Sequence, residues 1–430
     1  MKWNQKIWQR SVKDFGEFIE PIIGTMGRSE RREGAALYLQ GLLMPGERKS
    51  IEPMAQRLRA DSQKLQQLIA DSPWEDEEMW GAIRQEIIPT FGTPLAWIVD
   101  ETGWLKQGKK SVGVAHQYCG AVGKQGNCQI SVEVVISDGE IAAPVAGRLY
   151  LPSVWTEDRL RCDAAGVPPT IGFQSKPMIA LDLIREVALD GVSHAPVLGD
   201  EVYGTSSELR RGLRELGLEY FFHAGDELLA WTKRPQTRLG RKHWGVAHGE
   251  AESVRVPELV RALNKTQWRA AAWRAADGSQ RQTRIAWLPV YLQSDLDSKT
   301  GDWPQSWLVA DWPAKQPEPF RIYTARFKAA PLKNRCLQLS RGRCAIEQFF
   351  QRDKTDLGLD QYEGRSWRGF HHHLVLAALA YLFVSAVYLR SKKNSWCYVG
   401  SGVASDPAVV HSLERILPLL QNGISGSKIK

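Results

Sequence analysis

The order of candidate strands and helices between residues 95 and 223 constrains the fold of this chain more than any other feature of its sequence. Short β-rich runs come first, and two of them are separated by Gly-Lys-Gln-Gly-Asn at residues 123–127, which is typical of a hairpin. Apolar residues at helical spacing then alternate with short apolar strands. The candidate strands cover residues 95–100, 111–122, 128–137, 141–150, 195–200 and 218–223, and the candidate helices cover residues 176–189 and 206–216.

An antiparallel meander followed by alternating helices and strands predicts an α/β fold, a mixed sheet with flanking helices. This order matches a ribonuclease H-like fold. With 430 residues, the chain has room for two or three structural units. We expect a helical N-terminal region (1–92), the first part of the ribonuclease H-like domain (93–224), a β-rich insertion (225–335), the helical completion of that domain (336–395) and a tail (396–430).

The N-terminal region permits two interpretations. Its helices could form a DNA-binding region, although no helix-turn-helix spacing is compelling. A helical cap on the core explains the same pattern equally well.

Positive charge is concentrated in and just after the insertion. The whole chain has a formal net charge of +8, whereas residues 225–345 hold 21 Lys+Arg and 11 Asp+Glu, a net of +10, together with eight of the 17 tryptophans. Basic side chains among flat aromatic rings suit a nucleic-acid surface, because charges contact phosphates while rings stack on bases. A tryptophan-rich β core with a solvated basic face explains the composition equally well.

One apolar stretch raises the question of a membrane helix. Residues 374–389 are almost wholly apolar, but a membrane helix needs roughly 20 such residues, so we expect a buried core helix and no membrane partner. The triple histidine at 371–373 is not expected to bind a metal, because consecutive helix residues point in different directions. Without a secretory signal or a CxxC pair, the chain is expected to be cytoplasmic and nucleoid-associated.

Three carboxylates carry the candidate chemistry. Asp100 and Asp200 each end a predicted strand, where a sheet presents side chains to a cleft. Glu347 lies on a predicted helix, with Arg343 four residues before it and Lys354 seven residues after it. Arg343 and Glu347 therefore share a helix face.

Three converging carboxylates require a cation. Two unit charges about 4 Å apart repel by about 4 kcal/mol at an effective dielectric of 20. Oxygen ligands without His or Cys select Mg²⁺, with Mn²⁺ as a substitute. Two such ions can activate a water or a 3′-hydroxyl and stabilise the leaving oxygen of a phosphoryl displacement. The sequence therefore predicts a two-ion site at Asp100, Asp200 and Glu347.

Several separated motifs carry a family resemblance. The chain resembles the DDE transposases of bacterial insertion sequences, in the insertion-sequence 701-type branch, whose catalytic fold is interrupted by a β-rich insertion before the final Glu. The matching segments are Trp-Ile-Val-Asp-Glu-Thr-Gly-Trp-Leu-Lys-Gln-Gly (97–108), Arg-Leu-Tyr-Leu-Pro (148–152), Gly-Asp-Glu-Val-Tyr-Gly (199–204) and Gly-Leu-Asp-Gln-Tyr-Glu-Gly-Arg-Ser-Trp-Arg-Gly-Phe-His-His-His (358–373).

The resemblance implies an enzyme in which three acids bind two divalent ions and drive DNA strand cleavage and strand transfer. It assigns those roles to Asp100, Asp200 and Glu347. The branch also carries a Y-x2-R-x3-E-x6-K pattern, which Arg343, Glu347 and Lys354 match, while Ser340 stands at the tyrosine position. A homodimer on DNA is implied as well, because two transposon ends must be paired.

Further residues are expected to support the site or to contact DNA. Glu101 and Tyr203 are candidates for supporting the acids without binding metal. Two other interpretations stay open: a DNA-binding protein without catalysis, and a nuclease without strand transfer. The predicted contacts with transposon-end and target DNA are Arg343, Lys354, Arg365, Arg368, Arg238, Arg241 and Lys242.

Overall fold

A computed structural model describes residues 5–44, 46–139, 141–274, 279–319 and 321–396. Helices form the N-terminal part, and a capping side chain marks the start of α4. The carboxylate of Asp61 accepts a hydrogen bond from the backbone N–H of Gln63 at the start of α4, as expected for an N-cap. These helices are α1 (Gln5–Ile23), α2 (Ser29–Leu43), α3 (Ile51–Leu58), α4 (Ser62–Ala70) and α5 (Asp76–Ala82).

The central sheet has the strand order of a ribonuclease H-like fold. β1 pairs antiparallel with β3, and β3 pairs antiparallel with β4. On its other side β1 pairs in parallel with β5, and β5 in parallel with β6. The predicted fold class is therefore confirmed. The strands are β1 (Ala96–Leu105), β3 (Lys124–Ser137), β4 (Ala142–Leu149), β5 (Val197–Gly199) and β6 (Tyr220–His223), and β2 (Ala115–Cys119) adds a hairpin to β3.

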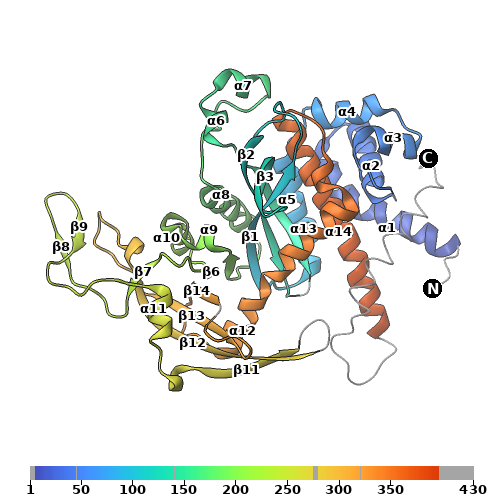
Figure 1. Cartoon of the computed structure of the whole chain (residues 1–430). Coiled ribbons are helices and arrows are strands. Elements are labelled where there is room, and N and C mark those ends of the chain that lie inside the picture. The colour runs from blue at the N-terminus through green and yellow to red at the C-terminus, as the bar shows by residue number, and fades with distance from the viewer. Residues whose placement is uncertain (1–4, 45, 140, 275–278, 320, 397–430) are drawn as a thin grey trace.

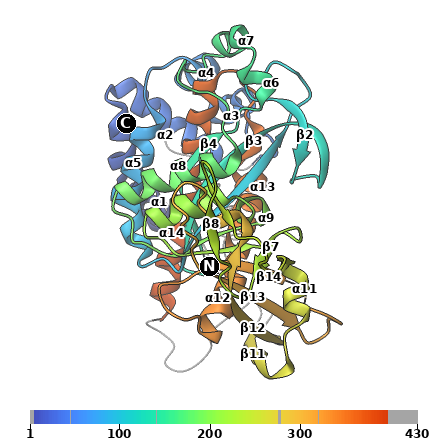
Figure 2. The ribbon, with the colours of Figure 1, turned by 90° about the vertical axis from the view of Figure 1, so that its left-hand side faces the viewer.

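Strands of the 225–335 region continue this sheet. β14 pairs antiparallel with β6, and β13, β12, β7 and β10 follow, which gives a sheet of twelve described strands. Figures 1 and 2 show these strands extending from the central sheet toward one end of the molecule. The hairpin β8–β9 forms a separate two-stranded sheet. Their bounds are β7 (Leu229–Trp231), β8 (Thr237–Leu239), β9 (Trp244–Val246), β10 (Val254–Arg255), β11 (Arg269–Arg274), β12 (Gln280–Leu292), β13 (Ser306–Pro313) and β14 (Arg321–Arg326).

Helices cover both faces of the central sheet (Figure 1). α8 (Lys176–Leu189) has the bounds that its apolar spacing predicts, and it packs with α10 (Ser207–Glu215). α13 (Cys344–Leu357) and α14 (Trp367–Trp396) pack on the opposite face. Short helices fill connections: α6 (Ser153–Thr156), α7 (Arg159–Ala164), α9 (Glu201–Gly204), α11 (Val256–Arg261) and α12 (Lys333–Gly342). The expected tail, apart from Trp396, lies outside the described residues.

The apolar stretch forms the centre of the core. The segment Trp367–Val387 of α14 is long and apolar enough to cross a membrane, yet 94% of its most apolar window is buried inside the protein. Phe370 packs against Trp104 of β1 with ring centroids 4.3 Å apart, and Tyr381 packs against Phe349 of α13. α14 therefore has the packing of a core helix, as predicted.

Candidate active site

Asp100 lies on β1, and Asp200 lies directly after the neighbouring parallel strand β5. β1 and β5 pair with Trp97 opposite Val197 and Ile98 opposite Leu198, so the same register brings position 100 level with position 200. Asp200 directly follows β5 and accepts a hydrogen bond from the backbone N–H of Val202, 2.9 Å away, as the N-cap of α9. The two predicted acids therefore meet at one edge of the site.

The first strand is longer than predicted. Its expected end was Asp100, but β1 continues to Leu105 because residues 101–105 pair with β3, ending with Leu105 opposite Cys128. Asp100 consequently sits in the middle of a strand and is only 7% exposed. Its side chain points to the face that α13 covers.

Arg343 connects the third acid to the first. Its guanidinium donates to Asp100 Oδ2 over 2.8 Å and lies 3.9 Å from Glu347 Oε1. The Glu347 side chain is 60% exposed, and that of Arg343 is 25% exposed. Among the described residues no group of three or more His, Cys, Asp or Glu is placed to hold a metal ion. The structure thus gathers the three acids around an arginine and does not bring them into mutual contact.

Burial and repulsion from a neighbouring carboxylate dominate the electrostatics of Asp200. The pKa of Asp200 is raised, first by burial and then by the charge of Asp100, while Arg343 acts in the opposite direction. Burial alone would lower the pKa of Arg343, but Asp100, Asp200 and Glu347 together leave it raised. The site therefore has more negative charge than a buried environment tolerates without a cation.

Glu101 and Tyr203 lie close to the two aspartates. Glu101 Oε1 accepts from the ammonium of Lys176 over 2.5 Å, whereas its buried Oε2 has no hydrogen-bond partner in the described part of the chain. Burial raises the pKa of Glu101, and the charges of Asp200 and Asp100 add to this effect. Tyr203 is fully buried, and its hydroxyl likewise finds no described partner.

The donor set fits Mg²⁺ or Mn²⁺. The charged ligands on offer are carboxylate oxygens, which hard divalent cations prefer. Glu101 supplies an unpartnered buried oxygen beside them. The residues that could hold ions are Asp100, Asp200 and Glu347, with Glu101 adjacent.

The predicted DNA contacts fall into three groups. Lys354 points into the fold, where its ammonium donates to the carbonyl of Gly103 over 2.8 Å. Its contact with DNA stays a prediction, and the position of this ammonium does not support it. Arg365 and Arg368 are exposed at the start of α14. The hairpin β8–β9 and its loop expose Arg238, Arg241 and Lys242.

Five of the eight tryptophans of residues 225–345 lie on strands of the twelve-stranded sheet. All eight are buried or half-buried. The indole N–H groups of Trp231, Trp303 and Trp312 donate to backbone carbonyls over 2.6, 2.8 and 2.9 Å. Trp303 is buried and the other seven rings are half-buried, so they pack against neighbouring residues and keep part of their surface exposed.

Sequence reasoning missed two buried acids beside the site. Glu133 stands directly opposite Asp100 on β3 and has no exposed surface, and burial raises its pKa to about 7. Asp353 of α13 is equally buried, and neither carboxylate oxygen has a described partner. The signal for Glu133 was available, because it is a lone charge inside the apolar run at residues 130–136.

Comparisons with known proteins point to one family. The model of a family described as "DDE superfamily endonuclease" matches residues 21–282, which include Asp100 and Asp200 but not Glu347. The chain is 30% identical over 184 residues to a "Probable transposase for insertion sequence element IS701" of Microchaete diplosiphon, and these residues are 42% of this chain and 45% of that relative. The chain therefore matches less than half of the length of this relative.

A solved structure is also similar. It is the cryo-EM structure of a piggyBac transposase synaptic complex with hairpin DNA, with a TM-score of 0.45 and 11% identity. The likeness covers 98% of this chain and 82% of that one. At this level of similarity it supports no conclusion about function.

Proposed function

Because the chain belongs to the DDE superfamily endonuclease family, we propose that it is a DNA transposase that binds the terminal inverted repeats of its own insertion sequence, cleaves the DNA there and joins the 3′ ends to target DNA. One observation carries this proposal. Asp100 of β1 stands level with Asp200, which directly follows the neighbouring parallel strand β5. Arg343, at the start of the helix that carries Glu347, contacts both Asp100 and Glu347.

In the proposed mechanism Asp100, Asp200 and Glu347 would hold two Mg²⁺ ions. When bound, such ions activate a water or 3′-hydroxyl and stabilise the leaving oxygen. β1 and β5 keep the two aspartates level, and Lys176 holds Glu101 beside them. Arg343 balances part of the charge of the acids through its contacts with Asp100 and Glu347.

The proposal predicts the outcome of removing single acids. We expect Asp100→Asn and Glu347→Gln to lower cleavage of transposon-end DNA in Mg²⁺ by at least about 10³-fold, because each substitution removes a charged metal ligand. Rates of nicking of an end-labelled duplex measure this effect. Glu86→Gln, which changes an exposed glutamate on the N-terminal helices, should cleave at the wild-type rate. Wild-type rates in both acid variants would show that the assigned acids are not catalytic.

A strand-transfer assay separates the proposal from a nuclease. Pre-cut ends and a supercoiled target are incubated with the chain in Mg²⁺, and joined products are measured. Joined product supports a transposase, whereas cleavage with no joined product supports a nuclease without strand transfer. Biological activity that survives loss of the acids would instead support a DNA-binding protein without catalysis.

We further propose that two copies pair two transposon ends in the DNA complex and that the chain acts at the nucleoid in the cytoplasm. The basic hairpin β8–β9 supports the DNA contact through its exposed cations. The proposed assembly requires both ends at once, so a single end should give little joined product.

A further inference from the structure

A third strand brings a histidine to the level of the two aspartates. β5 pairs in parallel with β6, and Gly199 stands opposite Phe222. The same register brings Asp200 level with His223, which ends β6. Asp100 on β1 is level with Asp200 on the other side. Ligands of open sheets bind at the carboxyl ends of parallel strands, and His223 stands at that edge.

The His223 side chain lies on the same face of the sheet as Asp100. Its partner on β14 is Tyr323, and the two rings lie 4.6 Å apart. The Tyr323 hydroxyl donates to the carbonyl of Ser340 in α12 over 3.5 Å, and directly opposite residues point to the same face. Arg343, which contacts Asp100, follows at the end of α12. The imidazole and the acids therefore lie under the same pair of helices.

A close backbone contact fixes His223 relative to Asp200. α9, which Asp200 caps, ends at Gly204, and a Cβ atom there would lie only 1.9 Å from the carbonyl oxygen of His223. Only glycine fits at this position. The buried guanidinium of Arg210 also donates to the carbonyl of Gly204. The backbones that carry Asp200 and His223 are therefore packed directly against each other.

The His223 ring is open to a ligand and lies among positive charges. The residue is half-buried, and within the described part of the chain its imidazole makes no hydrogen bond. Burial lowers the pKa of His223 from 6.5 to about 4, and the charges of Arg343 and Arg321 act in the same direction. At neutral pH the ring is therefore uncharged and carries one N–H donor. A donor beside two cations suits an anion.

Arg321 is the second group on this side of the site. It begins β14 two residues before Tyr323, so the two side chains share a face, and they are joined by a hydrogen bond. Asp311, which stands opposite Arg321 on β13, also pairs with Arg341 over 2.7 Å and bonds to Thr283. One carboxylate thus lies beside two arginines, and positive charge remains next to the imidazole.

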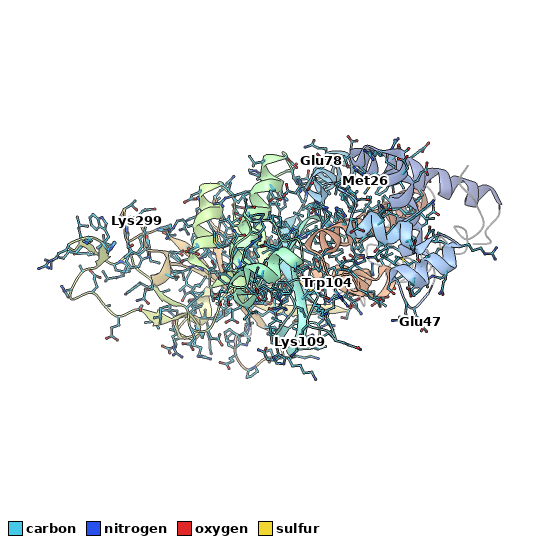
Figure 3. The ribbon with its side chains drawn as sticks, turned by 90° about the horizontal axis from the view of Figure 1, so that it is seen from above. Met26, Glu47, Glu78, Trp104, Lys109 and Lys299 are labelled. Carbon is cyan, nitrogen blue, oxygen red and sulfur yellow. The ribbon has the colours of Figure 1, made fainter. Side chains whose placement is uncertain are left out.

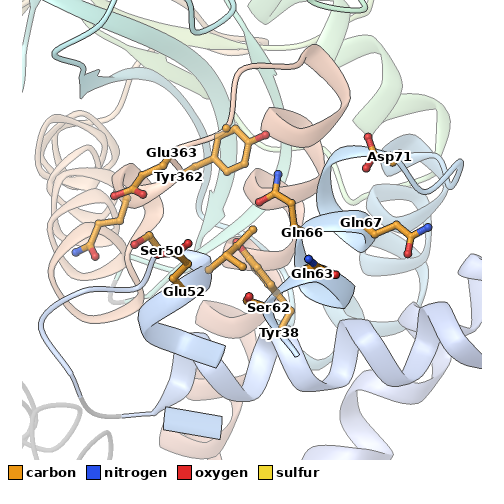
Figure 4. A pocket seen from close by; sticks show the side chains of 13 residues that line it. Tyr38, Ser50, Glu52, Ser62, Gln63, Gln66, Gln67, Asp71, Tyr362 and Glu363 are labelled. Carbon is orange, nitrogen blue, oxygen red and sulfur yellow. The ribbon is translucent and has the colours of Figure 1, made fainter. Parts of the chain in front are cut away.

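The pocket between α4 and the connection before α14 has the opposite charge (Figure 4). The carboxylates of Glu52, Asp71 and Glu363 line it, and they would repel a phosphate. Both charges that act on the His223 ring are positive. A phosphate is therefore favoured at the carboxyl end of β6 and not in this pocket.

The spacing of the strands identifies which phosphate is within reach. Neighbouring strands lie about 4.8 Å apart, so His223 stands about 5 Å beyond the level of Asp200. Two ions at the acids would lie roughly 4 Å apart, with the scissile phosphate between them. His223 is outside that span, so the phosphate that it can reach is a neighbour of the scissile one.

We propose that His223 and Arg321 bind a backbone phosphate next to the scissile phosphate and so position the DNA strand on the acids. The inference rests on the proposed function and adds a DNA contact to its site. The imidazole N–H would donate to a phosphate oxygen, and the guanidinium of Arg321 would supply charge. A backbone contact of this kind does not depend on base sequence.

Neutral phosphates placed one at a time test the contact. Transposon-end duplexes carry a single methylphosphonate at successive positions around the cleavage site, and the full-length chain binds them in Ca²⁺, which also takes oxygen ligands. We expect one position to weaken binding by the wild type about tenfold. His223→Ala should bind the unmodified duplex about tenfold more weakly and lose nothing further at that position, because the contact is already gone.

Matched variants sharpen the test. Arg321→Met should lose sensitivity at the same position as His223→Ala. His223→Gln keeps an N–H donor and should recover part of the wild-type affinity. His116→Ala removes an exposed histidine of β2 and should keep the wild-type pattern. Circular dichroism of each variant checks that it is folded.

A second scan identifies the DNA that supplies the phosphate. Methylphosphonates are placed in the target duplex, and joining of pre-cut ends to it is measured. Lost sensitivity of His223→Ala in the first scan assigns the phosphate to the transposon end, and lost sensitivity in the second assigns it to the target.

The inference and the proposed function can fail separately. A folded His223→Ala variant that keeps the wild-type sensitivity at every position in both scans would overturn the phosphate contact. An equal added loss at every position would also overturn it, because the ring would then only support β6. Cleavage by the acid variants tests the proposed function, and that result does not depend on either scan.

Discussion

At the scale of single residues, Arg343 is the side chain that connects the acids of the candidate site. It donates to Asp100, 243 positions earlier in the chain, over 2.8 Å. It also lies 3.9 Å from Glu347, which is 4 positions later on the same helix face. Asp100 and Asp200 would otherwise repel each other in a mostly buried setting. The guanidinium therefore neutralises part of the carboxylate charge that would attract a divalent ion.

Removing this charge should favour metal binding. We expect Arg343→Met to lower the dissociation constant for Mn²⁺ by roughly threefold to tenfold, on the order of 1 kcal/mol, because a competing cation is gone. Isothermal titration of the DNA-free chain measures this. Arg352→Met, on the same helix, is the control and should bind Mn²⁺ as the wild type does. Weaker binding in Arg343→Met would show that the arginine organises the acids and does not compete for them.

At the scale of elements, the triple histidine links α14 to three different neighbours through hydrogen bonds. His371 accepts from the backbone N–H of Leu149 in β4, and His372 bonds to the end of α4. His373 bonds to Tyr38 of α2 over 2.7 Å and to the carbonyl of Leu359 over 2.9 Å. The expectation that consecutive histidines point apart agrees with these contacts, and each ring has a structural partner.

These buried rings should make stability depend on pH. Burial lowers the pKa of His372 from 6.5 to about 4, so the unfolded chain binds its proton more readily, and the stability present above pH 6.5 is lost as the pH falls toward 4. His372→Gln keeps an N–H donor and does not titrate. Between pH 7 and pH 5 its free energy of unfolding should fall by about 2 kcal/mol less than that of the wild type.

Urea unfolding at the two pH values measures the difference. His116→Gln changes an exposed histidine and should leave the pH dependence of the wild type intact. An equal fall in His372→Gln and wild type would mean that this ring is not buried in its neutral form.

Local patterns predicted some elements closely and others poorly. The apolar spacing of residues 176–189 gave the bounds of α8 because that helix buries one continuous face. The end of β1 was wrong, because residues 101–105 are held by pairing with β3 and not by their own pattern. β7, β10 and β14 are two to six residues long, and they depend on partners far along the chain. The contact of Arg343 with Asp100 has the same long-range origin.

At the scale of the whole molecule, strands of residues 225–335 are built into the central sheet. Two ion pairs hold this part to the helices: the buried pair of Arg210 of α10 with Asp295 over 2.7 Å, and the partly buried pair of Arg341 of α12 with Asp311 over 2.7 Å. Figure 3 shows Lys299 at one end of the molecule and Glu47 toward the other, with Trp104 between them.

The basic hairpin should contribute to the affinity for DNA through its charge and not to sequence preference. Replacing Arg238, Arg241 and Lys242 by glutamine should weaken binding to DNA duplexes of different sequence alike. The slope of log affinity against log salt should become shallower by about 3, because each phosphate contact contributes about 0.9. Fluorescence anisotropy across a salt series measures the slope. An unchanged slope would show that the hairpin is a solvated basic surface that does not contact DNA.

The central claim is that the acids hold divalent ions at the scissile phosphate, and a change of ligand chemistry tests it most directly. Asp200→Cys replaces a hard oxygen ligand by a softer sulfur, which binds Mn²⁺ better than Mg²⁺. The measurement is cleavage of end DNA by this variant in each metal. We predict no cleavage in Mg²⁺ and substantial recovery in Mn²⁺. Wild-type cleavage in Mg²⁺, or no recovery in Mn²⁺ by the folded variant, would contradict the assignment.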